Sequence, residues 1–346
     1  MSAATAAEEP LLAVESVDVV LGRGWRATQI LSGVDLRVWP GEIVGLVGET
    51  GSGKTTLART VAGLVDPVRG RIVLGGTVIS ALRRGARRAE RRRGHLQLVF
   101  QDPLRSLDPD LTVQNIVGEG LRIRGDSAAE IRARVAGALD KVGLDATVLH
   151  RTPGRISGGQ RQRVSIARAL ATEPQLLICD EPVSALDASN RNYILRLLGE
   201  LRTSLGLSIV IISHDLSSLA GIADRVAVLY RGRIVEDGPV DRVFATPRHP
   251  YTALLMASAP SIRQHSVRHD RPFSPEQLRR AASAPPPAGP GACVFADRCR
   301  FAADACAVQP PLTAIGERWS VACHRQEEWG ALARAVTSQE GPAHAR

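Results

Sequence analysis

The sequence is poor in aromatic residues, in lysine and in long apolar runs. Aromatic residues make up 3% of the 346 residues, so a core must be built mainly from Val, Leu, Ile and Ala. Lysine occurs only at Lys54 and Lys141, so arginine supplies nearly all of the positive charge behind a net charge of +9. No segment approaches the roughly 18 consecutive apolar residues that a membrane-spanning helix needs. The first ten residues are partly acidic and lack an apolar stretch, which excludes a secretory signal and leads us to expect a cytoplasmic protein.

The length predicts two or three domains with a sizeable core. Seven arginines crowd into residues 83–95. One interpretation is a nucleic-acid patch, and the other is a solvated, like-charged helix face or loop. No aromatic residues interleave for base stacking, which favours the second interpretation.

A glycine-rich loop gives the strongest indication of chemistry. The apolar run Ile43–Val47 ends at Gly48, and a helix-like stretch, Leu57–Leu64, follows the loop. The pattern G-x-x-x-x-G-K-[ST] between a strand and a helix is typical of phosphate binding, because loop N–H groups and the helix dipole attract the anion. We expect Lys54 to reach the β- and γ-phosphates and Thr55 to ligate Mg²⁺. The candidate phosphate-binding residues are Gly48, Glu49, Thr50, Gly51, Ser52, Gly53, Lys54, Thr55 and Thr56.

Alternating apolar residues predict strands over Leu12–Leu21 and Ile30–Val38, ahead of this loop. Trp25 stands between the two strands. Its flat ring can stack on an adenine, or it can be a half-buried packing residue; both interpretations are open at this point.

Beyond the loop, Arg71–Ile79 predicts a strand pair and His95–Phe100 a short strand that ends at Gln101. Near-helical spacing over Leu111–Leu149 predicts a helical insertion between strands of the sheet. A further helix begins at Ser157 and runs to Thr172. Ser157 is a good N-cap, and two glycines at the start of a helix make an anion site, although capping alone does not explain why both are needed.

Two adjacent carboxylates, Asp180 and Glu181, follow the apolar strand Leu176–Cys179. One can hold Mg²⁺ while the other acts as general base on water. An acidic surface loop is the alternative, but it would not need the preceding apolar run. Cys179 within that run is expected to be an inert small hydrophobic residue.

His214 follows the next predicted strand, Ser208–Ile212, at the ligand side of an α/β sheet. A lone histidine is usually structural, but this position favours a phosphate contact. Asp187 precedes a predicted helix over Tyr193–Leu205. Residues 225–236 predict a hairpin around Arg231-Gly232.

The α/β body is expected to end near residue 262. Cys293, Cys299, Cys306 and Cys323 lie beyond a Pro/Gly-rich linker, with 5, 6 and 16 residues between them. Zinc usually takes closer cysteine pairs, disulfides are disfavoured in the cytoplasm, and a Cys₄ iron–sulfur cluster tolerates varied spacing. Spacing alone leaves metal and disulfide open.

Taken in order, these motifs resemble an ATP-binding cassette (ABC) ATPase over roughly residues 12–325. The resemblance implies an α/β P-loop NTPase with a mixed sheet core, an antiparallel β subdomain and an α-helical subdomain, plus a small Cys-rich extension. The expected divisions are a disordered lead (1–10), the ATPase domain (11–262, with its helical subdomain near 102–172), a linker (263–292), a four-cysteine domain (293–325) and a tail (326–346). Two departures from the family pattern are Ile156, where leucine is commoner, and Trp25, where the adenine-stacking residue is commonly tyrosine.

FQDPLRSLDP, EPVSALDAS, YRGRIVEDG and RHPYTALL, together with the four cysteines, resemble the ATPase subunits of oligopeptide, dipeptide and nickel importers. EPVSALD is similar to the second ATPase of such a pair. This implies a heterodimer with a sister ATPase under two permeases, fed by an extracytoplasmic binding protein. It also implies a peripheral position on the cytoplasmic face of the membrane, without a nucleic-acid partner. For the four cysteines the resemblance implies a [4Fe–4S] cluster.

The resemblance further implies individual roles. Gln101 approaches Mg²⁺ and the attacking water, Asp180 supports Mg²⁺, Glu181 polarises the water and His214 contacts the γ-phosphate. The segment Ser157, Gly158, Gly159 and Gln160 faces the ATP bound to the partner subunit, and Asp187 lies at the seam between subunits.

Peptides are the expected substrate, with nickel or another small solute as the alternative. A soluble cassette acting on ribosomes or nucleic acid is disfavoured by the single cassette and the lack of sustained heptads. A non-hydrolysing regulatory cassette is disfavoured by the presence of both Glu181 and His214.

Overall fold

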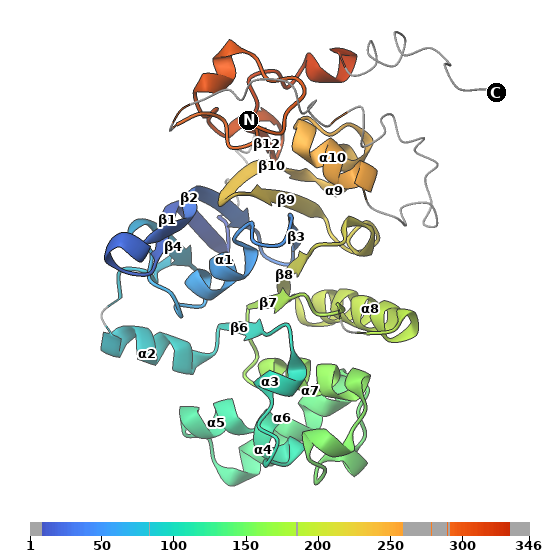
Figure 1. Cartoon of the computed structure of the whole chain (residues 1–346). Coiled ribbons are helices and arrows are strands. Elements are labelled where there is room, and N and C mark those ends of the chain that lie inside the picture. Colours follow the sequence, from blue (N-terminus) through green and yellow to red (C-terminus); the bar gives the residue numbers. More distant parts are fainter. Residues whose placement is uncertain are drawn as a thin grey trace, which may run out of the picture. The chain divides into compact units, whose positions relative to one another are not determined.

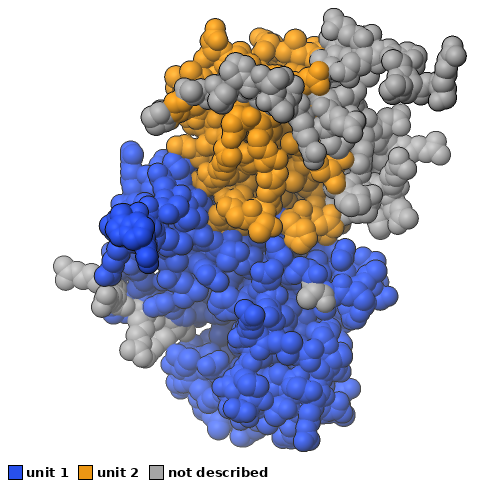
Figure 2. All heavy atoms as spheres, viewed as in Figure 1, with its two compact units in different colours: residues 1–44, 55–213 blue, residues 45–54, 214–346 orange. Residues whose placement is uncertain are grey.

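The computed structural model describes residues 9–82, 84–184, 186–258, 278, 289 and 291–332. The chain divides into two compact units, which Figure 2 colours separately. Unit 1 comprises Met1–Val44 and Thr55–Ser213, and unit 2 comprises Gly45–Lys54 and His214–Arg346. Most of the predicted lead, linker and tail lies outside the described residues, so those divisions stay predictions.

Unit 1 contains an antiparallel sheet with the order β2-β1-β4-β5 (Figure 1). Its strands are β1 (Leu12–Leu21), β2 (Thr28–Val38), β4 (Arg69–Leu74) and β5 (Thr77–Val78). Along β2, buried and exposed residues alternate from Gly33 to Val38, because one face of an antiparallel sheet packs on the core while the other meets water. The predicted strands in this part of the chain are confirmed.

Unit 1 also contains three parallel strands, β6 (Leu96–Val99), β7 (Leu176–Asp180) and β8 (Ser208–Ser213). Every residue of β7 and β8 is buried, as expected for parallel strands covered on both faces. The carboxyl ends of parallel strands share one edge, so this arrangement brings the polar residues after β6 and β7 to the same edge.

Two helices begin earlier than the sequence pattern predicted. Helix α1 spans Lys54–Val61 and α8 spans Ala188–Leu205. The side chain of Asp187 accepts a hydrogen bond from the amide of Asn190 and so starts α8 at Ala188. Apolar periodicity misses such first turns, because a phosphate loop or a cap rather than an apolar residue sets the start of the helix.

The helical insertion predicted over Leu111–Leu149 is confirmed by the second to fourth of a group of helices that lie together in Figure 1. They are α3 (Pro103–Ser106), α4 (Val113–Val117), α5 (Glu119–Arg124), α6 (Ala128–Lys141) and α7 (Gly158–Leu170). Gly118 separates α4 from α5, and Gly125 ends α5 in a left-handed conformation. The arginine-rich stretch forms helix α2 (Arg84–Arg93).

Unit 2 contains antiparallel strands in the order β11-β12-β10-β9. They are β9 (Arg225–Tyr230), β10 (Arg233–Pro239), β11 (Thr313–Gly316) and β12 (Trp319–Val321), and helices α9 (Val240–Ala245) and α10 (Pro250–Ser258) belong to the same unit. The predicted hairpin is confirmed. The four-cysteine region therefore shares a sheet with β9 and β10, and its status as a domain of its own stays a prediction.

Among the described residues, no helix combines the length and the apolar character needed to cross a membrane.

Candidate functional site

The phosphate loop has the backbone that its glycines predict. The φ angles of Gly48, Gly51 and Gly53 are 153°, 82° and 109°, a region that L side chains rarely adopt. A Cβ at Gly48 would overlap the carbonyl oxygen of Leu229 and lie 2.9 Å from the hydroxyl of Ser52. Gly48 is therefore required both for its conformation and for the close approach of neighbouring atoms.

Two buried side chains of this loop suit an anion. Lys54 is 5% exposed, and its ammonium donates to the carbonyls of Gly48 (2.7 Å) and Glu49 (2.9 Å). Ser52 is also 5% exposed, and its hydroxyl has no hydrogen-bond partner among the described residues. A buried polar group without a partner is costly, so an incoming phosphate oxygen would find both a cation and an available donor. The loop therefore fits a nucleotide phosphate.

Thr55 and Asp180 meet in unit 1, where the Thr55 hydroxyl donates a 3.3 Å hydrogen bond to an Asp180 carboxylate oxygen. Asp180 is 4% exposed at the end of β7, which excludes the acidic surface loop as an account of this residue. Hydroxyl and carboxylate oxygens are ligands that Mg²⁺ accepts, and phosphates and water complete its coordination. The pair therefore fits Mg²⁺ bound together with a nucleotide.

Gln101 and Glu181 also meet in unit 1. The Gln101 side-chain nitrogen donates a 2.9 Å hydrogen bond to the Glu181 carboxylate. The φ angle of Glu181 is 46°, and its amide donates to the carbonyl of Ile212 on the neighbouring strand β8. A non-glycine residue in this region costs on the order of 1–3 kcal/mol, and such residues are enriched at functional sites. The strain supports a role for Glu181 beyond packing.

The start of α7 forms the expected cap. The Ser157 hydroxyl accepts from the amide of Gln160 (3.2 Å), and the Gln160 side chain accepts from the amide of Ser157 (2.9 Å), which makes a capping box. Gly159 is buried, and a Cβ there would lie 2.5 Å from the side-chain oxygen of Asn190. At Gly158 the surroundings are open apart from one Arg161 nitrogen at 3.8 Å. The close approach of Asn190 thus explains why residue 159 is glycine. Gly158 has no side chain and keeps the helix start accessible.

Asn190 joins this helix start to Asp187. Its amide and side-chain nitrogens donate to the two Asp187 carboxylate oxygens at 3.0 and 2.7 Å. These hydrogen bonds hold the pKa of Asp187 below its usual value, so the carboxylate stays ionised. Asn190 was not among the predicted site residues; its position three residues after Asp187, which caps α8, was the available signal.

Trp25 is 87% exposed and lies beneath the Arg26 guanidinium, 4.5 Å from the ring centroid. The half-buried alternative for Trp25 is therefore wrong, and its exposed face is accessible for stacking. His214 follows β8 directly and is exposed. His214 belongs to unit 2 and Glu181 to unit 1.

The four C-terminal cysteines line one cavity of about 20 Å³ in unit 2, together with His249 and His324. All five cysteines of the chain are free thiols. Burial, with a smaller contribution from neighbouring cysteines, raises the pKa of Cys299 and of Cys323 to about 12. Among the described residues, no group of three or more His, Cys, Asp or Glu is arranged to hold a metal ion. Cys179, buried in β7, has the structural role expected of it.

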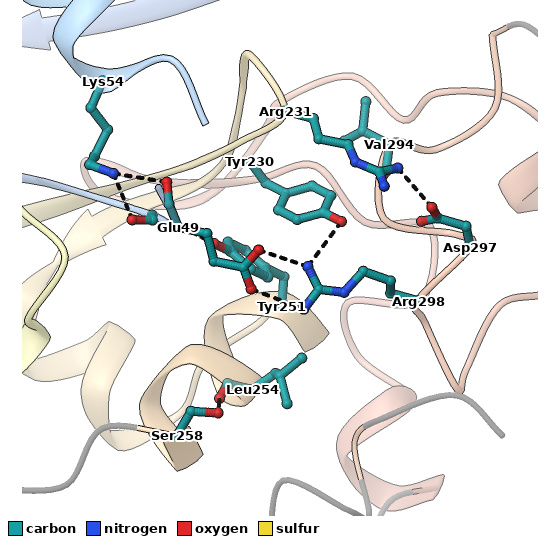
Figure 3. A network of polar contacts seen from close by, with 11 residues as sticks. Glu49, Lys54, Tyr230, Arg231, Tyr251, Leu254, Ser258, Val294, Asp297 and Arg298 are labelled. Atoms are coloured by element: carbon teal, nitrogen blue, oxygen red, sulfur yellow. Dashed lines mark hydrogen bonds and ion pairs between the residues drawn. The ribbon is translucent and has the colours of Figure 1, made fainter. Parts of the chain in front are cut away.

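A polar network around Glu49 was also missed by the sequence analysis (Figure 3). Arg298 donates to both carboxylate oxygens of Glu49, and the Tyr251 hydroxyl accepts from the Glu49 amide. Arg298 lies in the four-cysteine region, far along the chain from the loop. No local pattern indicates such a contact.

Comparisons with known proteins agree with this architecture. Residues 31–184 match the family model described as ABC transporter. The structure resembles the ATP-binding cassette MJ0796, solved as a dimer bound to ADP and Pi, with a TM-score of 0.60 and 28% identity over 66% of this chain and 98% of that one. It also resembles cbiO1 of Clostridium perfringens, with a TM-score of 0.61 and 32% identity over 69% of this chain and 92% of that one.

The chain therefore belongs to the ABC transporter ATPase family and has its P-loop fold. Within that family it is of the oligopeptide/dipeptide type. Residues 235–306 match the model described as the C-terminal region of oligopeptide/dipeptide transporters. A peptide import ATP-binding protein of Brucella ovis is 42% identical over 88% of this chain and 94% of its own length. The oligopeptide transport ATP-binding protein OppF of Escherichia coli is 39% identical over 93% of this chain and 98% of its own.

Proposed function

We propose that this chain hydrolyses ATP to drive the import of oligopeptides or dipeptides through a membrane permease. The observation that carries the proposal is the hydrogen bond between Gln101 and Glu181, in the unit where Thr55 meets Asp180. These pairs supply the polar groups that hydrolysis needs, a carboxylate for water and oxygens for Mg²⁺. The names of the relatives favour peptides over nickel.

Different residues of the chain bind phosphate, orient the cation and accept the proton. ATP when bound supplies the phosphoryl group, and Mg²⁺ neutralises charge on its oxygens. Loop amides from Gly48 to Thr56 and the Lys54 ammonium bind phosphate, while Thr55 and Asp180 orient the cation. Glu181 accepts a proton from water, with Gln101 holding its carboxylate in place. His214 is proposed to contact the γ-phosphate, and Trp25 to stack on the adenine.

The start of α7 is proposed to complete the site of a second, sister ATPase. Ser157 and Gly158 are exposed at a helix N-terminus whose free amides and dipole favour an anion. Asp187 is tied to this helix start through Asn190. We propose a heterodimer held under two permease subunits at the cytoplasmic face of the membrane. An extracytoplasmic binding protein delivers the peptide.

The four thiols around one cavity are proposed to hold a [4Fe–4S] cluster. Four cysteines suit either that cluster or Zn²⁺, and either cation favours the thiolate that burial otherwise opposes. Iron and acid-labile sulfide should accompany the anaerobically purified chain, and Cys299→Ser should lose them. Cys179→Ala is the matched control, because Cys179 lies in β7 and not on the cavity. Stoichiometric zinc without iron would overturn the cluster.

The function is tested in proteoliposomes that contain the chain, its sister ATPase and the two permeases. We expect ATP-dependent accumulation of a labelled oligopeptide in the presence of the binding protein. Accumulation of Ni²⁺ but of no peptide would show that the substrate is nickel, and the proposed ATPase activity would stand. Absence of ATP hydrolysis in the assembled complex would refute the proposal as a whole.

A further inference from the structure

Glu49, the second residue of the phosphate loop, is engaged through three of its groups (Figure 3). Its carboxylate accepts from the two terminal nitrogens of Arg298 at 2.8 and 2.9 Å. Its amide donates to the Tyr251 hydroxyl at 2.9 Å, and its carbonyl accepts from Lys54 at 2.9 Å. The position of Glu49 is therefore defined jointly by the loop lysine and by residues outside the loop.

Arg298 is itself held in place by aromatic residues of unit 2. One terminal nitrogen donates to the Tyr230 hydroxyl at 3.3 Å, and the guanidinium lies 5.7 Å from the Tyr230 ring centroid and 5.9 Å from that of Phe295. The Tyr230 ring packs against Tyr251 and Phe295 with centroids 4.4 and 5.3 Å away. A planar guanidinium that stacks and binds a carboxylate with two nitrogens loses little freedom on pairing.

Arg298 belongs to the four-cysteine segment. It directly precedes Cys299, and Phe295 lies two residues after Cys293. Both cysteines line the thiol cavity, and Phe295 also borders it. The guanidinium that holds Glu49 therefore lies one residue from a cavity thiol, and the Phe295 ring on which it packs lies two residues from another.

The ion pair between Arg298 and Glu49 affects the binding of ATP more than it affects the stability of the fold. Arg298 is 39% and Glu49 43% exposed in their side chains, and ion pairs as exposed as this contribute little to folding. An unpaired Glu49 carboxylate, however, would add a negative charge to the loop that must bind a triphosphate. Arg298 removes that repulsion and fixes the conformation of the loop at its second residue.

We propose that Arg298 is a positioning residue for the phosphate loop, and that through it the four-cysteine segment sets the affinity for ATP. The inference rests on the proposed binding of ATP by this loop. It requires no contact between Arg298 and the nucleotide.

The test measures binding of labelled ATP to the full-length chain by equilibrium dialysis. Arg298→Ala should raise the Kd for ATP by about tenfold, because the unpaired Glu49 carboxylate then repels the triphosphate. Arg298→Lys keeps the charge but loses the two-nitrogen geometry, so its Kd for ATP should lie between those of wild type and Arg298→Ala. Glu49→Gln in the Arg298→Ala background should restore much of the affinity, because the repelling charge is gone.

Asp297→Asn is the matched control. Asp297 pairs with Arg231 at 2.8 Å in the same segment, so this change breaks a neighbouring ion pair without touching the loop. We expect an unchanged Kd for ATP. In the assembled complex, Arg298→Ala should raise KM for ATP while kcat stays within about twofold. Circular dichroism and thiol or metal content establish that each variant is folded.

Three results overturn the inference. One is an unchanged Kd in Arg298→Ala, another is a double variant no better than Arg298→Ala, and the third is an equal loss in Asp297→Asn. Failure of the wild-type chain to bind ATP would instead refute the proposed function on which the inference depends.

Discussion

The side-chain nitrogen of Gln101 lies 2.9 Å from a carboxylate oxygen of Glu181, although 80 positions separate the two residues in the sequence. Parallel pairing of β6 with β7 brings these residues to one edge of the sheet. The amide fixes the direction of the carboxylate, and the left-handed backbone at Glu181 turns it out of the strand. A general base must be oriented before it can accept a proton, and this contact orients the carboxylate for which we propose that role.

Glu181→Gln should keep ATP binding and lower turnover at this site at least about 100-fold, because the amide cannot accept the proton from water. The measurement is single-turnover hydrolysis in the assembled complex, with the sister site inactivated. Glu173→Gln is the matched control, since Glu173 also has a left-handed backbone (φ 56°) but forms a surface ion pair with Arg134. Near-normal hydrolysis in Glu181→Gln would remove the general-base role.

Ser157→Ala and Ser127→Ala form a matched pair, because each serine forms a capping box, on α7 and α6 respectively. Both changes should cost about 1 kcal/mol of unfolding free energy. Ser157→Ala alone should also weaken ATP-dependent pairing with the sister subunit, measured by sedimentation in the presence of ATP. Equal effects of the two changes on pairing would indicate that Ser157 serves only as a cap.

Gly48→Ala should abolish ATP binding, because the new methyl group overlaps the carbonyl of Leu229 and the residue cannot keep a φ of 153° without strain. Equilibrium dialysis with labelled ATP measures the loss. Gly221→Ala serves as control, since no atom of the described residues lies within 4 Å of the position that its methyl group would take, and its φ is not left-handed. Retained ATP affinity in Gly48→Ala would show that the loop can deform without cost.

Glu236 should make stability fall as pH rises. Burial raises the pKa of this carboxyl from 4.5 to about 7, against hydrogen bonds donated by the amides of Arg248 and His249 and by the Trp319 ring. Between these two pH values the folded chain keeps a proton that the unfolded chain has lost. The contribution of Glu236 to the free energy of unfolding is therefore fully present below pH 4.5. It is lost progressively up to about pH 7, by about 3 kcal/mol in all.

The measurement is the unfolding free energy from denaturant titrations at pH 5, 6, 7 and 8, compared between wild type and Glu236→Gln. The difference in unfolding free energy between wild type and Glu236→Gln should shrink as pH rises from 5 to 7, while the difference between wild type and Glu200→Gln, which alters an exposed carboxyl on α8, should stay constant. Burial lowers the pKa of His249 to about 3, which gives an opposite slope below pH 6.5 in both proteins and cancels in the comparison. Equal slopes in wild type and Glu236→Gln would contradict the prediction.

The sequence alone determined the motifs and most of the elements. The phosphate loop, the cap at Ser157 and the carboxylates after β7 could be found because each depends on local chemistry. Glycine is needed where φ is positive, serine where a helix has free amides, and an apolar run where a strand is buried. The starts of α1 and α8 were placed too late, because caps and loops rather than apolar periodicity define them.

Only the tertiary structure decided which distant residues meet. Arg298 lies 249 positions from Glu49, and Asn190 joins two motifs that the sequence showed as separate. The four thiols share a cavity that their spacing could not predict. Such contacts depend on how whole strands and helices pack, and no local pattern records that packing. The sequence thus predicted a site for ATP, and the fold linked its phosphate loop to the four-cysteine segment.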